Sequence, residues 1–163
     1  MSDNTFQSKE FKNNLERYEA AYDAGKPLYL DPDELTDIAE YYHLHGQLGK
    51  ALDAIHLAIQ MFPGSTQPLA FRARVAILLD NNAEEAIQYA EQIEDKSDLD
   101  YYYIMAEIMI AGGDDDKANR YLTEKSAEIS NEDIDDYYLD VATLFADYDN
   151  LTMAKKWLSL MND

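Results

Sequence analysis

The side chains in this sequence that could take part in catalysis or bind a metal are three histidines and a large excess of carboxylates. The chain contains no cysteine. His43 and His45 form a His-x-His pair, and His56 follows in the next helical segment. Residues two apart on a helix point about 200° away from each other, which favours polar or partly buried histidines over metal ligands. The run 114–116, three aspartates, resembles part of a calcium loop but lacks the central glycine and the later glutamate. These acids fit helix capping better.

No residue pattern typical of an active site is present in the sequence. The absence of cysteine removes disulfides, thiolate metal ligands and thiol nucleophiles together. The sequence has no Gly-x-Ser-x-Gly, no glycine-rich phosphate loop and no His-Glu-x-x-His. Its carboxylates could be paired on paper for acid–base catalysis, but no sequence feature gives such a pair a pocket. We therefore predict that the protein is not an enzyme and that it uses no metal and no cofactor.

The charge of the chain is strongly negative, at −20. Between Asp80 and Asp140 there are 19 acidic residues and only four lysines or arginines. Such a field repels phosphate backbones, so we expect no binding to nucleic acid. No window approaches the roughly 20 apolar residues of a membrane helix, and the N-terminus lacks the order of a signal peptide. We predict a cytoplasmic protein without membrane association. The negative charge would alternatively serve only to keep the protein soluble.

Apolar spacing predicts helices along the whole chain and no strand except a short connector near Tyr29. A first helix over about 4–24 ends at Gly25 and Pro27. Four helix pairs then follow, at about 34–44 with 48–62, 67–79 with 83–95, 98–111 with 115–129, and 132–148 with 151–161. We therefore divide the chain into a flanking helix and connector at 1–30 and an array at 31–163, with units at 31–65, 66–97, 98–130 and 131–163.

Small residues recur in this array at a nearly constant period. Ala51, Ala86, Ala118 and Ala154 are separated by 35, 32 and 36 residues. A second series precedes the first by 12 or 13 residues and consists of Ala39, Ala73, Ala106 and Ala142. Two helices can cross closely only where a small residue faces the crossing. The shared period near 34 indicates that one helix-turn-helix unit is repeated.

The repeat unit resembles the tetratricopeptide repeat family. The best match is the first unit, with Leu35, Ile38, Ala39, Tyr42, Gly46, Ala51, Ile55, Ala58 and Pro63 at the family's intervals. The third unit matches well, and the fourth matches fairly through Tyr138, Val141, Ala142, Phe145, Ala154 and Leu158. The second unit is the weakest, and its register is open by one residue. The resemblance covers about residue 31 to the end and implies an all-α, right-handed superhelix (an α-α solenoid) that binds proteins or peptides.

In this family the first helices line a concave groove that is the usual peptide site. The resemblance assigns the following residues to that lining: Asp33, Thr36, Asp37, Glu40, His43, Phe71 with Arg74 (or Arg72 with Val75), Asp100, Tyr103, Ile104, Glu107, Asp136, Leu139, Asp140, Thr143 and Asp147. Acidic side chains around an aromatic and aliphatic floor suit a basic or amphipathic partner segment. They would repel the acidic tail of a heat-shock chaperone, which disfavours a role as chaperone-tail adaptor.

The end of the sequence leaves alternatives open. Trp157, Leu158, Leu160 and Met161 lie in the last predicted helix, and no polar capping helix follows. Homo-oligomerisation through this C-terminal end would make the protein a structural self-association module. The chain would otherwise be the N-terminal portion of a longer repeat protein, or Lys155 and Lys156 would keep the last helix solvated.

Overall fold

The computed structural model describes residues 3–161, and this range contains ten α-helices and no strand. The all-α prediction is confirmed. The helices are α1 (Asp3–Gln7), α2 (Lys9–Ala24), α3 (Pro32–Leu44), α4 (Leu48–Met61), α5 (Thr66–Leu78), α6 (Ala83–Glu91), α7 (Leu99–Ala111), α8 (Asp115–Ser126), α9 (Ile134–Asp147) and α10 (Leu151–Leu158). No helix within residues 3–161 is long and apolar enough to cross a membrane.

Polar side chains at the helix starts explain where several helices begin. Asp31 accepts a hydrogen bond from the backbone N–H of Glu34 at 2.7 Å, and the Glu34 carboxylate accepts one from the N–H of Asp31 at 2.9 Å. This reciprocal capping box fixes the start of α3. Asp114 likewise accepts from the N–H of Lys117 at 3.2 Å, which confirms the capping role predicted for the acids before α8.

Some helix boundaries differ from the predicted ones. The predicted first helix is split at Ser8, whose hydroxyl accepts from the N–H of Phe11 at 3.1 Å and caps α2. Helix α6 ends at Glu91 rather than near 95, and α8 ends at Ser126 rather than near 129. Ile93, which follows the end of α6, is buried and lies at helical spacing from the buried Ala86 and Ala90.

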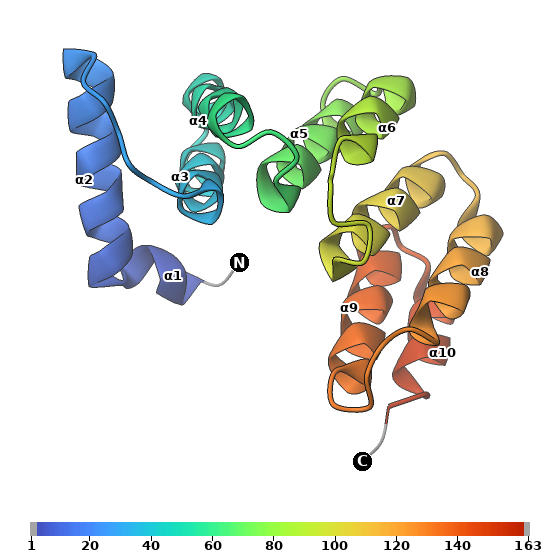
Figure 1. The fold of residues 1–163 in the computed structure, drawn as a ribbon. Coiled ribbons are helices and arrows are strands. Elements are labelled where there is room, and N and C mark those ends of the chain that lie inside the picture. The colour runs from blue at the N-terminus through green and yellow to red at the C-terminus, as the bar shows by residue number, and fades with distance from the viewer. Residues whose placement is uncertain (1–2, 162–163) are drawn as a thin grey trace. The chain divides into compact units, whose positions relative to one another are not determined.

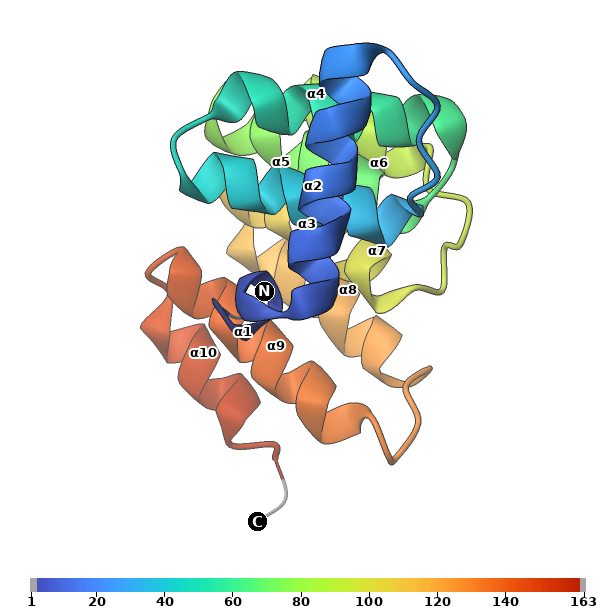
Figure 2. The same cartoon turned by 90° about the vertical axis from the view of Figure 1, so that its left-hand side faces the viewer.

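The helices form two compact units, with the division inside α5 after Arg72. In the first unit, α3 packs against α4, and α2 packs against α3 and crosses both helices (Figures 1 and 2). In the second unit, α7 pairs with α8 and α9 pairs with α10, while α6 and α9 both contact α7. Three of the four predicted helix pairs are therefore in contact, namely α3 with α4, α7 with α8 and α9 with α10. The pairing of α5 with α6 and the superhelical arrangement stay predictions.

The two alanine series lie inside the structure. All eight members are buried, namely Ala39, Ala51, Ala73, Ala86, Ala106, Ala118, Ala142 and Ala154. In the second unit the alanines of α7 to α10 lie in one core with Tyr102, Leu122, Tyr137, Phe145 and Trp157. Small residues thus sit beside the largest core residues, which allows close helix packing without voids.

Candidate functional site

The residues assigned to a partner surface in the first unit lie along α3, apart from Phe71 on α5. Two of these assignments are wrong, because Thr36 and Phe71 are buried in the packing of the helices. Asp33 and His43 are exposed, whereas Asp37 and Glu40 are partly buried, and their spacing of three or four residues places them on one helix face. The His43 ring contacts the Phe71 ring edge-on, with 6.2 Å between their centroids. We call Asp33, Asp37, Glu40 and His43 the α3 face.

Electrostatic crowding on the α3 face is concentrated at Asp37. The pKa of the Asp37 carboxyl is raised from 3.8 to about 6, first by partial burial and then by the nearby Glu40, Asp33, Asp31 and Glu34 carboxylates in that order. Burial and like charges both disfavour the ionised form. A positive charge brought to this face would remove part of that penalty.

In the second unit, the assigned residues that reach the surface lie on α7 and α9. The Tyr103 hydroxyl donates to the Asp140 carboxylate at 2.8 Å, and the Tyr103 ring stacks on Tyr137 at 5.9 Å between centroids. Burial, followed by this hydrogen bond, raises the pKa of Tyr103 far above its usual value. Leu139 and Thr143 are exposed on α9, and the Thr143 hydroxyl donates to the Leu139 carbonyl at 2.9 Å. Asp100 is partly exposed in the first turn of α7.

Of the other assigned residues of the second unit, Asp136 and Asp147 are exposed, whereas Ile104, Glu107 and Arg74 are engaged inside the protein. Ile104 is fully buried, and Glu107 is only 6% exposed. The Arg74 guanidinium donates to one Glu107 carboxylate oxygen at 2.9 Å, and the Tyr148 hydroxyl donates to the other at 3.1 Å. We call Arg74, Glu107 and Tyr148 the buried-acid cluster. Both carboxylate oxygens of Glu107 are therefore engaged by internal donors and do not face a partner.

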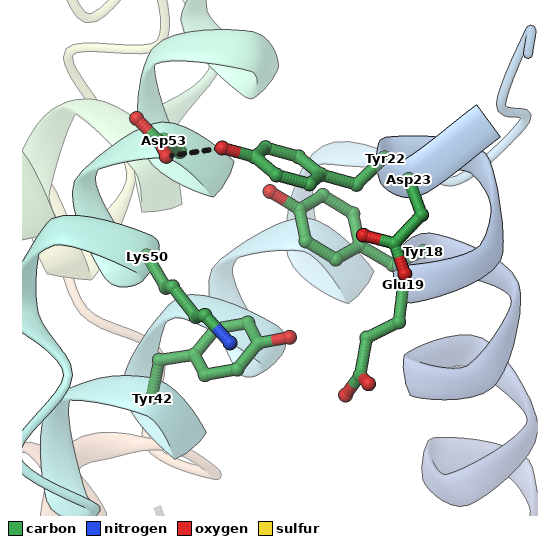
Figure 3. A pocket seen from close by; sticks show the side chains of 7 residues that line it. All are labelled: Tyr18, Glu19, Tyr22, Asp23, Tyr42, Lys50 and Asp53. Atoms are coloured by element: carbon green, nitrogen blue, oxygen red, sulfur yellow. Dashed lines mark hydrogen bonds between the residues drawn. The ribbon is translucent and has the colours of Figure 1, made fainter. Parts of the chain in front are cut away.

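A pocket that the sequence did not indicate lies in the first unit, between α2, α3 and α4 (Figure 3). Tyr18, Glu19, Tyr22 and Asp23 come from α2, Tyr42 from α3, and Lys50 and Asp53 from α4. The Tyr22 hydroxyl donates to the Asp53 carboxylate at 3.0 Å across the gap between α2 and α4. The four-residue spacing of the two α2 tyrosines was the available signal, but it is equally typical of a packing face.

The tyrosines of this pocket stay neutral over the physiological pH range. Burial, reinforced by the charge of Asp53 and by Tyr22, raises the pKa of Tyr18 to about 12. Burial also raises the pKa of Tyr42, with Glu19 as the largest charged contributor. The Lys50 ammonium lies over the Tyr42 ring, 5.5 Å from its centroid. The pocket therefore already holds one cation against a tyrosine ring.

Comparison of the chain with protein-family models, with curated proteins and with solved structures gives no match. The described residues contain no group of three or more histidine, aspartate or glutamate side chains arranged to hold a metal ion. The side chains of the candidate site offer carboxylates, neutral tyrosine hydroxyls and exposed apolar groups.

Proposed function

We propose that this protein is a cytoplasmic, non-catalytic scaffold of tetratricopeptide-like repeats that binds a basic or amphipathic segment of a partner protein. The observation that carries the proposal is the α3 face, where Asp37 is held among four other carboxylates with a raised pKa. A lysine or arginine placed there gains attraction from several acids and relieves their mutual repulsion.

The composition of the second unit supports the same partner chemistry. Tyr103, Leu139 and Asp140 bring an aromatic ring, an exposed aliphatic group and a carboxylate together on α7 and α9. An amphipathic helix or extended segment uses such a mixture of apolar anchors and charge contacts. A net charge of −20 would also steer a basic partner toward the protein and speed its capture.

We expect a rhodamine-labelled amphipathic peptide, with lysines on one face and leucines on the other, to bind the full chain. Its association rate should fall as salt rises, because the Debye length shrinks below about 10 Å above 0.1 M. Binding should tighten from pH 5 to pH 7, since Asp37 ionises near pH 6 and only its charged form attracts lysine. Stopped-flow fluorescence across salt and pH measures both effects.

Two double variants make this test specific to the α3 face. Asp37→Asn with Glu40→Gln should slow association several-fold and flatten its rise with pH. The control is Glu84→Gln with Glu94→Gln, which removes two exposed carboxylates outside the α3 face. It changes the net charge of the protein by the same amount as the first double variant. Equal slowing by both double variants would show a response to overall charge only, and a rate independent of salt would overturn the proposed partner chemistry.

Self-association is the second candidate function, and exposed leucines favour it. Leu151, Leu158 and Leu160 are 59%, 45% and 52% exposed at the last helix. Exposed large apolar side chains are typical of surfaces that pair with another chain. We expect sedimentation equilibrium to give a monomer over a wide concentration range, because two chains of charge −20 repel each other. A dimer at micromolar concentration and physiological salt would favour self-association instead.

A further inference from the structure

Three adjoining hollows lie along α2 and α4 in the first unit, and Tyr18 and Tyr22 line all of them. The smallest, of about 100 Å³, is the tyrosine-and-carboxylate pocket of Figure 3. The largest, of about 400 Å³, is mainly apolar and includes Tyr29, Leu57 and Met61. The third, of about 330 Å³, shares Asp53 with the first and Leu57 with the second. We call this continuous surface the α2–α4 groove.

One end of the α2–α4 groove carries an excess of negative charge. Glu19, Asp23 and Asp53 line the small pocket, and Lys50 is the one basic residue among its lining side chains. The ammonium of Lys50 lies over the Tyr42 ring, and the Tyr22 hydroxyl satisfies one oxygen of Asp53. Three carboxylates facing one amine leave this end complementary to an added cation.

The other end exposes apolar side chains on a fixed backbone. Tyr29 is 82% exposed and Met61 is 41% exposed. The connector that carries Tyr29 is held by the Arg17 guanidinium, which donates to the Tyr29 carbonyl at 3.1 Å, and by the buried Leu30. A tyrosine presented on an ordered connector loses little conformational entropy on binding, and methionine adapts to the shape of its partner.

The acidic end and the apolar end of the groove together fit one kind of partner segment. Resting on the proposed function of partner binding, we propose that the α2–α4 groove binds a partner segment with an arginine or lysine close to a large apolar residue. The cation lies against Glu19, Asp23 and Asp53, and the apolar side chain fills the hollow beside Tyr29, Leu57 and Met61. A second copy of this chain fits less well, because its charge of −20 opposes the acidic end.

The test is a titration of the full chain, labelled with ¹³C at its six methionine methyl groups and with ¹⁵N, followed by NMR. The probe is the peptide acetyl-Arg-Gly-Trp-amide, and acetyl-Glu-Gly-Trp-amide is its matched control. We expect the arginine peptide to shift the Met61 methyl signal and the amide signals around Tyr22, Asp53 and Leu57. The glutamate peptide should shift them at least several-fold more weakly at equal concentration.

Three variants separate the parts of the groove. Asp53→Asn should weaken binding of the arginine peptide about 3- to 10-fold, and Tyr29→Ala should weaken it about 5- to 30-fold. Tyr22→Phe keeps the ring and frees one oxygen of Asp53, so binding should be retained or become tighter. Glu84→Gln, an exposed carboxylate on α6, is the control. Unchanged amide spectra of the unbound variants verify that each one folds.

The remaining outcomes overturn this inference and separate it from the proposed function. Shifts confined to the α3 face or to Tyr103 would refute the groove and leave the proposed function intact. No shift anywhere would refute the groove, while stopped-flow binding of the amphipathic peptide would decide the proposed function independently. Equal binding of both tripeptides would refute the cation contact, and groove signals that move with protein concentration alone would identify a second copy as the occupant.

Discussion

Trp157→Ala is expected to lower the free energy of unfolding by about 3–5 kcal/mol, the largest loss that we predict for a single substitution. The Trp157 side chain is buried in the core of the second unit, and its ring contacts Tyr137 and Tyr138 at centroid distances of 6.0 and 5.9 Å. Its indole N–H donates to the Asn119 side-chain oxygen at 2.8 Å. Truncation would leave a cavity beside two aromatic rings and an unsatisfied partner on α8.

Urea unfolding followed by circular dichroism measures this loss, since Trp157 is the single tryptophan and the variant has no indole fluorescence. The matched control is Leu158→Ala, the adjacent residue, which is exposed. We expect the control to change the free energy of unfolding by less than about 1 kcal/mol. Similar losses for both variants would contradict the packing described for α10.

The helix pairs and the buried alanines could be predicted because they depend on local spacing. Ala39 and Ala51, or Ala106 and Ala118, recur at intervals that the helical period and the crossing of two helices impose. A small residue at a crossing is needed whatever else the chain does. The positions of the core alanines therefore followed from the sequence alone.

The side chains around those alanines were harder to place, since adjacent apolar residues compete for one position. The repeat register selected Tyr138 and Leu158 for the core, whereas the structure buries Tyr137 and Trp157 most deeply. Neighbours on a helix differ by about 100° in direction, so a shift of one residue exchanges them. Tyr137 donates to the Leu122 carbonyl at 2.6 Å and Trp157 to Asn119, and such partners are invisible to periodicity.

The candidate site depended on contacts between segments far apart in the sequence. Arg74 and Glu107 are 33 residues apart, about one repeat, and Tyr148 meets Glu107 from 41 residues away. Projection of one helix face treats each residue as solvent-facing and omits the next helix that covers it. The α2–α4 groove was missed for a related reason. Helix α2 lies outside the repeat, and Tyr22 on α2 meets Asp53, which is 31 residues away in the sequence.

The buried-acid cluster gives the second large expected effect. Arg74→Met should lower the free energy of unfolding by about 2–3 kcal/mol, because it leaves the carboxylate of Glu107 buried with only the hydroxyl of Tyr148. This value lies below the loss for a fully buried ion pair, since the Arg74 side chain is 43% exposed. Urea unfolding again provides the measurement, and Arg120→Met, an exposed arginine on α8, is the control.

A double-mutant cycle then separates an internal role from a partner-binding role for this pair. With Glu107→Gln as background, Arg74→Met should cost much less than in the parent protein, because no buried charge is left unpaired. Binding of the amphipathic peptide should change little in either single variant that remains folded. If Arg74→Met were as silent as Arg120→Met in unfolding but slowed peptide binding, Arg74 and Glu107 would belong to a partner surface. The distances of 2.9 and 3.1 Å within the cluster favour the internal role, since both carboxylate oxygens of Glu107 already accept hydrogen bonds.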